Sequence, residues 1–428
     1  MVSAPRQFAA RFLCAQTRPG DFAEHRLESD PGFLALAPVD RRLAQELILG
    51  VLRWRDTLDW LIAQKTDGRP QKPTLQVLLR LGLYQLFWLD RIPDHAIVHE
   101  TVAQAQELGF GSQSGFINAV LRSYVRERDA TRQRLDELQR SDPAVGWSCP
   151  RWLLDRWATQ LNPEELTRLC RWNNTPPTTF ARVNTLRMSP REVAELWIEE
   201  GVEFEERQFD WTEPGLVFEL TAHPPLASLE SFRAGGFYLQ DPSTLLAVQL
   251  LDPRPGESIL DLCAAPGGKT TFIAQRMENR GRIVAHDPSG KRLELLRENC
   301  VRLGVTNVEM TTELPPPDPV FDRILVDAPC SNTGVLRRRV ELRWRLTADE
   351  LDRLTETQFA LLEQAASRLK PGGRGVYSTC SLEAEENSAV IQRFLTAHPD
   401  FILESQRALH PIADSVDGAF VALLQRRG

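Results

Sequence analysis

A regular alternation of strand-like and helix-like segments begins near Phe237, and it constrains the fold more than any other feature. Apolar runs typical of buried strands alternate with segments that have the three- and four-residue apolar spacing of amphipathic helices. The expected strands are 258–262, 282–286, 323–326 and 375–378, and the expected helices are 269–277, 290–303, 349–369 and 385–397. This alternation predicts an α/β fold with a doubly wound, mostly parallel sheet.

The first part of the chain has helical apolar spacing instead. Residues 1–145 predict an all-α domain with helices at 9–15, 41–62, 75–89, 98–108 and 113–126. Residues 146–235 predict a small α+β domain, with helices at 147–161 and 191–201 and strands at 180–184 and 216–220. Together with 236–428, this gives three domains, a number that 428 residues allow.

Composition excludes several classes of protein. The formal net charge of −7 argues against nonspecific coating of nucleic acid, although local basic runs still allow an RNA-binding face. Seven cysteines, an odd number without metal-ligand spacing, indicate a reduced cytoplasmic setting and no metal site. The chain has neither a signal-like segment nor an apolar stretch of about 18 residues, so we expect no membrane association.

A glycine-rich turn follows the first expected strand of the sheet. Its glycines, Gly267 and Gly268, let the backbone approach a ligand, and the helix that begins there offers free N–H donors. Asp287 ends the next strand 19 residues after Gly268, near the distance of about 20 residues at which an acidic side chain holds a ribose. The turn is not a P-loop, because a P-loop would need a glycine where Cys263 stands. We interpret it as a binding site for a nucleotide-type cofactor, and the alternative is a tight turn without a ligand.

Two cysteines lie at the ends of apolar runs downstream of this turn. Cys330 closes the run 324–330, and Cys380 lies in the run 375–381. Because open α/β sheets bind ligands at the carboxyl ends of their strands, two thiols there predict covalent chemistry beside a cofactor. The alternative is that both are small buried hydrophobic side chains, which is common for free cysteine.

Three motifs in this order resemble the Sun/Nop2-type RNA 5-methylcytosine methyltransferases, which use S-adenosylmethionine. They are Asp-Leu-Cys-Ala-Ala-Pro-Gly-Gly-Lys-Thr at 261–270, Asp-Ala-Pro-Cys-Ser-Asn-Thr-Gly at 327–334 and Ser-Thr-Cys-Ser-Leu-Glu-Ala-Glu-Glu-Asn at 378–387. Segments 40–41, 50–53, 79–86 and 115–122 resemble a NusB-like domain, and 180–186 resembles the family's RNA-contacting intermediate domain. The resemblance covers essentially the whole chain and implies a Rossmann-like methyltransferase domain after a NusB-like domain.

The NusB-like domain marks the enzymes of this family that act on bacterial small-subunit (16S) rRNA. The resemblance therefore implies methylation of carbon 5 of a 16S rRNA cytosine, by a cytoplasmic protein that we expect to be a monomer. One alternative is a tRNA cytosine-5 methyltransferase, and another is a noncatalytic RNA-binding or ribosome assembly factor. The intact Cys330, Cys380 and Asp327 favour an enzyme.

The resemblance also implies roles for individual residues. Cys380 is the nucleophile, Cys330 is the second thiol that helps release the methylated base, and Asp327 hydrogen-bonds the cytosine edge close to the cofactor. The residues expected to bind the cofactor are Cys263, Ala264, Ala265, Pro266, Gly267, Gly268, Lys269, Asp287, Thr312 and Asp327. The residues expected to bind RNA are Arg182, Arg337, Arg338 and Arg339, and a solvated charged face is the alternative for the last three.

Two positions depart from the family's pattern. Thr312 occupies the usually acidic position that meets the adenine amino group, with Glu313 beside it. Either Glu313 substitutes for the missing carboxylate or the affinity for the cofactor is lower. Arg339-Val340-Glu341 replaces a His-Pro-Asp triplet, which affects the expected details of RNA docking rather than of methyl transfer.

Overall fold

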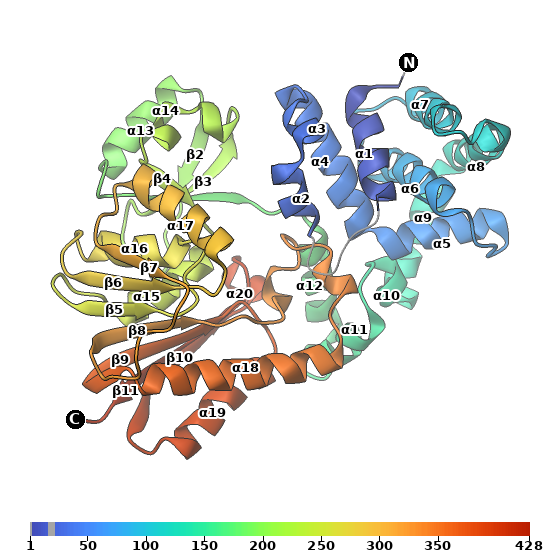
Figure 1. Ribbon diagram of the computed structural model, residues 1–428. Helices are drawn as coiled ribbons and strands as arrows, with labels where there is room; N and C mark the ends of the chain where they lie inside the picture. The colour runs from blue at the N-terminus through green and yellow to red at the C-terminus, as the bar shows by residue number, and fades with distance from the viewer. Residues whose placement is uncertain (1, 16–21) are drawn as a thin grey trace. The chain divides into compact units, whose positions relative to one another are not determined.

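The computed structural model describes residues 2–15 and 22–428, and the chain forms two compact units. The first consists of Met1–Thr175 and Leu336–Arg345, and the second of Pro176–Val335 and Leu346–Gly428 (Figure 1). The helices of residues 143–174 thus belong with the helical unit, although the sequence pattern assigns most of them to the small α+β domain at 146–235. The small sheet belongs to the same compact unit as the large one.

The first unit, which we call the helical unit, is built from short amphipathic helices. They are α1 (Ala4–Cys14), α2 (Ala23–Ser29), α3 (Pro31–Leu34), α4 (Pro38–Arg53), α5 (Arg55–Thr66), α6 (Pro73–Trp88), α7 (Asp94–Glu107), α8 (Ser114–Arg126), α9 (Arg128–Ser141), α10 (Pro143–Gly146), α11 (Arg151–Trp157) and α12 (Pro163–Asn174). Several begin with proline, whose fixed φ suits the first helical turn. The single helix expected at 41–62 is two helices, because Trp54 leaves the helical conformation between α4 and α5.

Ten residues from the second half of the chain complete the helical unit, and we call Leu336–Arg345 the strap. The guanidinium of Arg343 is buried and donates to the carbonyl oxygens of Ser148 (3.1 Å) and Asn173 (2.8 Å). Trp344 Nε1 donates to the Leu52 carbonyl at 3.0 Å. The strap is therefore an integral part of this unit's interior.

The second unit contains a seven-stranded sheet with the order β10-β11-β9-β8-β5-β6-β7. Its strands are β5 (Ser258–Asp261), β6 (Arg282–His286), β7 (Val308–Thr311), β8 (Phe321–Asp327), β9 (Leu369–Thr379), β10 (Phe401–Leu409) and β11 (Ala419–Arg426). Strands β5 to β9 pair in parallel, whereas β11 pairs antiparallel with both β9 and β10. The predicted α/β class with a doubly wound, mostly parallel sheet is confirmed.

Helices cover both faces of this sheet, which explains why its strands are nearly continuous apolar runs (Figure 1). One face packs on α15 (Leu245–Leu251), α16 (Gly268–Arg276) and α17 (Gly290–Leu303), and the other on α18 (Ala348–Ala366) and α19 (Ser388–Ala397). Consecutive residues of β5 serve different faces: Ile259 packs with the first set of helices and Leu260 with the second. The short helix α20 (Pro411–Asp414) precedes β11.

The small sheet has the order β2-β3-β1-β4, with every neighbouring pair antiparallel. Its elements are β1 (Thr179–Val183), α13 (Pro190–Glu199), β2 (Glu203–Glu206), β3 (Val217–Ala222), α14 (Glu230–Arg233) and β4 (Phe237–Leu239). Trp197 of α13 is fully buried and packs edge-on against Phe218 and Phe237. In the parts of the chain that the structure describes, no helix is long and apolar enough to cross a membrane.

Candidate active site

A cleft opens at the carboxyl ends of β5 and β8, where the chain direction across the sheet reverses. From β5 the chain proceeds outward to β6 and β7, and it then returns to β8 and β9 on the other side of β5. The cleft has an empty volume of about 570 Å³ and is lined by Tyr238, Leu239, Gln240, Thr244, Asp261, Cys263, Ala264, Ala265, Pro266, Gly268, Lys269 and Asp327. This switch point is where open α/β sheets bind their ligands.

The glycine-rich turn brings backbone to one wall of this cleft. Gly267 has a φ of +105°, and a Cβ atom there would lie 2.3 Å from Leu296 Cδ1, so the position favours glycine on both counts. Helix α16 starts at Gly268 and presents its N-terminal turn to the cleft. Most of the expected cofactor residues line the cleft, whereas Gly267, Asp287 and Thr312 are not part of its lining.

Asp261 is a residue of the cleft wall that sequence reasoning did not single out. Its side chain is buried and accepts a hydrogen bond from Thr270 Oγ1 at 2.7 Å. Its Oδ1 atom is buried without a hydrogen-bond partner among the described residues. Burial raises the pKa of this carboxyl to about 7. A carboxyl group in the wall of the cleft suits a cationic ligand such as S-adenosylmethionine, which carries an ammonium and a sulfonium group.

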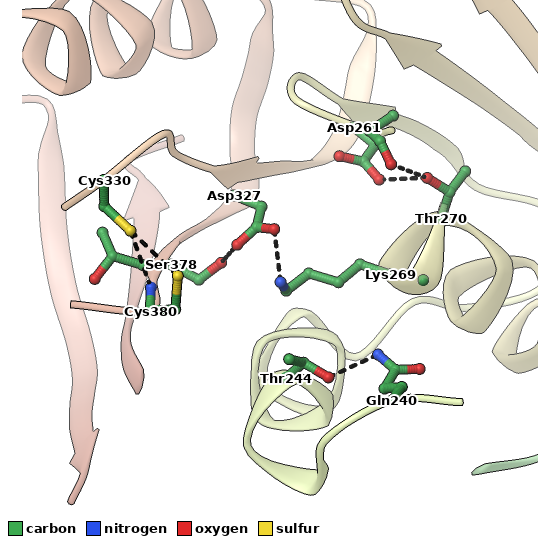
Figure 2. A network of polar contacts seen from close by, with 12 residues as sticks. Gln240, Thr244, Asp261, Lys269, Thr270, Asp327, Cys330, Ser378 and Cys380 are labelled. Carbon is green, nitrogen blue, oxygen red and sulfur yellow. Dashed lines mark hydrogen bonds and ion pairs between the residues drawn. The ribbon is translucent and has the colours of Figure 1, made fainter. Parts of the chain in front are cut away.

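Asp327, at the end of β8, links the cleft to the two cysteines. One oxygen is 2.6 Å from Lys269 Nζ, and the other accepts from Ser378 Oγ of β9 at 2.8 Å (Figure 2). Burial lowers the pKa of Lys269, but the charge of Asp327 and its hydrogen bond outweigh that effect, so the pKa is raised overall. Lys269 is therefore a cation, and it fixes the Asp327 carboxylate between the cofactor cleft and the thiols.

The thiols of Cys330 and Cys380 point toward one another, with 3.3 Å between the sulfur atoms (Figure 2). They are unequal, because Cys330 is buried whereas Cys380 is partly exposed and donates to Asn332 Oδ1 at 3.0 Å. The hydrogen bond with Cys380, burial and the nearby charges of Cys380 and Glu386 raise the pKa of Cys330 well above its ordinary value. Cys330 is thus held as a neutral thiol beside a more accessible sulfur.

The two cysteine-bearing loops approach closely at a glycine. Gly334 N donates to the Cys380 carbonyl at 3.0 Å. A Cβ atom at position 334 would lie 2.8 Å from that carbonyl oxygen and 2.6 Å from the carbonyl oxygen of Gly418. Any larger residue would therefore push the loops apart, which explains why the Thr-Gly pair follows Cys330 in the motif.

The expected RNA contact of Arg182 is not compatible with the structure. Its side chain is buried, and Nη1 donates to Gln240 Oε1 at 2.6 Å and to the Gly268 carbonyl at 2.8 Å. Burial lowers its pKa to about 9, and the guanidinium packs over the Phe272 ring at 4.8 Å. Arg182 therefore supports the cofactor turn from behind, a role that a strand with alternating polarity does not reveal.

The basic run at 337–339 also differs from the exposed face that the sequence pattern predicts. Arg337 is buried in the helical unit with its guanidinium 3.9 Å from the centre of the Trp172 ring. Arg338 and Arg339 are half-buried. An exposed RNA contact is thus wrong for Arg337, because the cation meets an aromatic ring of its own unit. For Arg338 and Arg339 the RNA contact stays a prediction.

Within residues 2–15 and 22–428, no group of three or more His, Cys, Asp or Glu side chains could hold a metal ion.

Comparisons with known proteins assign each part of the chain. The NusB family matches residues 3–126, the RsmF/B-like ferredoxin-like domain matches 149–219, and the family described as 16S rRNA methyltransferase RsmB/F matches 248–425. A Bacillus subtilis protein named probable ribosomal RNA small subunit methyltransferase B is 33% identical over 418 residues, with 92% of each chain covered. The Cronobacter sakazakii ribosomal RNA small subunit methyltransferase B is 36% identical over 405 residues, with 91% of each chain covered.

Solved structures agree with this assignment. The crystal structure of PH0851 matches over the full length of both chains, with a TM-score of 0.78 and 25% identity. NSun6 from Pyrococcus horikoshii, solved with the S-adenosylmethionine analogue SFG, matches with a TM-score of 0.57 and 25% identity, covering 65% of this chain and 98% of NSun6.

A doubly wound sheet with a cofactor cleft at its switch point and two thiols beside that cleft defines an RNA methyltransferase that uses S-adenosylmethionine. The chain belongs to the RsmB/F family of 16S rRNA methyltransferases. The predicted family, enzyme class and cofactor are therefore confirmed, and so is the NusB-like domain at the start of the chain.

Proposed function

We propose that this protein methylates carbon 5 of a cytosine in 16S rRNA and that Cys380 is its nucleophile. The observation that carries the proposal is the pair of sulfur atoms 3.3 Å apart, next to an Asp327 carboxylate that also lines the cofactor cleft. The names of the relatives, which denote methylation of small-subunit ribosomal RNA, support the substrate.

Carbon 5 of cytosine is a poor nucleophile, so the reaction needs covalent assistance. In the proposed sequence, Cys380 Sγ forms a bond to carbon 6, and the electron pair of the 5,6 double bond makes carbon 5 nucleophilic. When bound, S-adenosylmethionine supplies an electrophilic methyl group. Afterwards the proton on carbon 5 leaves to a base, the double bond re-forms, and the bond between carbon 6 and Cys380 breaks.

The inequality of the two thiols supports their assignment. Cys380 is partly exposed, so a flipped base can reach it, whereas Cys330 is buried and its raised pKa keeps it protonated. A neutral thiol 3.3 Å from the nucleophilic sulfur is suited to protonate or shield that sulfur as it leaves. We therefore assign release of the product to Cys330.

Asp327 is assigned to the pyrimidine edge. Its carboxylate is held by Lys269 and Ser378, so it is already oriented without substrate. A hydrogen bond that the Asp327 carboxylate accepts from the protonated N3 of cytosine would make carbon 6 more electrophilic.

Asp287, Thr312 and Gly267 remain assigned to the adenosine half of the cofactor. Asp287 directly follows β6, accepts from Ser289 N at 3.0 Å, and lies 2.9 Å from Arg292 Nη1. Thr312 directly follows β7, the next strand of the sheet. Both positions therefore follow the carboxyl ends of β6 and β7, the two strands next in order after β5, which supports an adenosine site that extends along this edge. Contacts to RNA are proposed for Arg338 and Arg339.

The proposed substrate is tested with labelled S-adenosylmethionine, unmodified 16S rRNA and total tRNA. We expect label in 16S rRNA as 5-methylcytosine. Label in tRNA alone would identify the enzyme as a tRNA methyltransferase, and no label in either RNA would support a noncatalytic factor.

The proposed roles of the thiols predict opposite behaviour in the two alanine variants. Cys330→Ala should accumulate a protein–RNA adduct that survives denaturing electrophoresis, because the covalent bond forms but is released slowly. Cys380→Ala should form no adduct and lose methylation by several orders of magnitude, roughly 10³-fold or more. Cys300→Ala, which changes a buried cysteine of α17, is the matched control and should behave like the parent. Adducts in Cys380→Ala rather than in Cys330→Ala would reverse the assignment.

We also propose that the protein is a cytoplasmic monomer. Its free cysteines support a reducing compartment. Light scattering coupled to size-exclusion chromatography should give a mass near the 48.5 kDa of one chain.

A further inference from the structure

A buried carboxylate, Glu386, lies behind both cysteine loops without touching either thiol. It belongs to the short turn before α19, and its side chain is fully buried. Burying an ionised carboxylate is costly unless several donors satisfy it. The donors around Glu386 come from the two catalytic loops and from α18.

The first loop binds Glu386 through the residue that follows Cys330. Ser331 N donates to Glu386 Oε1 at 2.8 Å, and the Ser331 hydroxyl donates to Oε2. Both the backbone and the side chain of Ser331 therefore bind one carboxylate. These hydrogen bonds fix the backbone next to Cys330, which carries the buried thiol.

The second loop binds the same carboxylate through the residue that follows Cys380. The Ser381 hydroxyl donates to Glu386 Oε2 and lies 3.0 Å from Ser331 Oγ. The Ser381 carbonyl in turn accepts from Asn387 Nδ2 at 2.9 Å. One carboxylate oxygen thus bridges the hydroxyls next to the two cysteines.

Helix α18 completes the arrangement. Gln358 Nε2, also fully buried, donates at 3.0 Å both to Glu386 Oε1 and to the Pro329 carbonyl, one residue before Cys330. The Tyr377 hydroxyl donates to the Glu386 carbonyl at 2.6 Å, which anchors the backbone of the carboxylate to β9. The carboxylate therefore cannot shift without disturbing both loops.

We propose that Glu386 is a positioning residue that sets the distance between the Cys330 and Cys380 thiols. It acts through Ser331 and Ser381, each adjacent to one thiol. The inference rests on the proposed function for its catalytic consequence, but the spacing of the thiols can be measured without RNA or cofactor. Neutralising the carboxylate removes one acceptor and places an amide among donors, so the loops should separate.

The test compares Glu386→Gln with Glu385→Gln in the full-length protein. Glu385 is the preceding residue and its side chain is exposed, so its variant makes the same chemical change at the surface. Dibromobimane, which fluoresces when it bridges two nearby thiols, reports their spacing, and mass spectrometry identifies the bridge between Cys330 and Cys380. We expect Glu386→Gln to slow this bridging about tenfold or more, and Glu385→Gln to match the parent.

Kinetics separate positioning from general loss of structure. In Glu386→Gln, kcat for RNA methylation should fall by roughly 100-fold, because small misplacements of reacting groups are costly. The Kd for S-adenosylmethionine and the KM for RNA should change by less than about twofold, because Glu386 is not part of the cofactor cleft. A loss of bridging without any methylation by the parent would leave the positioning role supported and the proposed function rejected.

Two outcomes would overturn the proposal. One is a Glu386→Gln protein that bridges its thiols at the parent rate. The other is slowed bridging in which the Kd for S-adenosylmethionine and the KM for RNA rise as much as kcat falls, which would indicate a general loss of structure. If Glu386→Gln does not fold, the double variant Ser331→Ala, Ser381→Ala removes the two hydroxyl links instead. It should also slow bridging, and a parent-like rate in that variant would reject the proposal.

Discussion

Arg182 is the residue whose role the structure changes most. Its guanidinium donates to the Gly268 carbonyl and to Gln240, and both of these residues line the cofactor cleft. A buried cation here stabilises the turn through which the backbone meets the cofactor. We therefore expect Arg182 to support the cofactor turn rather than to contact RNA.

Replacing Arg182 by methionine should therefore weaken cofactor binding and leave RNA binding intact. We expect the Kd for S-adenosylmethionine, measured by calorimetry, to rise roughly tenfold, since the Gly268 carbonyl loses a charged donor. Arg191→Met is the matched control, because Arg191 is exposed on α13 and pairs only with Glu195 in the contacts that the structure gives it. A fall in RNA affinity with an unchanged Kd for the cofactor would restore the original interpretation.

At the residue scale, the sequence motifs predict the positions of the reactive side chains better than they predict which buried residues hold those side chains in place. Cys330, Cys380, Asp327 and Lys269 all meet at one edge of the sheet, as their positions after strands predict. Asp261 and Glu386 belong to the same motifs, but nothing in a linear pattern distinguishes a buried carboxylate from an exposed one. Their roles depend on donors that are distant in sequence, such as Gln358 for Glu386.

Among the elements, the strap is unusual because it belongs to the helical unit while the residues on both sides of it in the sequence belong to the other unit. It begins six residues after Cys330, yet its buried groups are satisfied by residues between Leu52 and Asn174. Arg343 also donates to Asn174 Oδ1 at 2.8 Å, so a single guanidinium joins α12 to the turn at Ser148. The guanidinium of Arg55 packs on the face of the Trp344 ring, 3.8 Å from the ring centre.

Arg343→Met should destabilise the helical unit because it leaves several buried acceptors without a donor. We expect the free energy of unfolding to fall by about 3 kcal/mol, measured from the first transition of a urea titration followed by tryptophan fluorescence. Arg353→Met on α18 removes an exposed ion pair and should lower the free energy of unfolding far less than Arg343→Met does. Equal effects of the two variants would mean that the strap contributes little to this unit.

Helices and strands could be predicted from the sequence where apolar residues recur with a regular period. They could not be predicted where their formation depends on pairing with a distant part of the chain. The residues of β6 and α17 follow the predicted ranges, because both have strong apolar patterns. Strand β2 reads Glu-Phe-Glu-Glu and forms only because β3 offers an edge to pair with. The burial of Arg337 against Trp172 is not predictable from the basic run at 337–339, since a sequence does not show which aromatic ring a cation will meet.

For the whole molecule, the division of the chain predicts a pattern of local opening. Residues 336–345 belong to the helical unit, whereas the neighbouring β8 and α18 belong to the other unit. In native-state hydrogen exchange at low denaturant, we expect amides of the strap to open with those of α4 and α12. Peptides covering 321–327 and 348–366 serve as controls and should open with the large sheet. Exchange of the strap together with these controls would contradict the division into units.

The discontinuity of the helical unit also imposes an order on biosynthesis. Arg345 is translated 170 residues after Thr175, so at about 5–20 residues per second the N-terminal helices wait roughly 10 to 35 seconds for the strap. Throughout that interval the carbonyl groups of Ser148 and Asn173 lack the guanidinium that satisfies them in the finished chain. The elongation rate between residues 176 and 345 therefore sets how long the nascent protein carries an incomplete first unit.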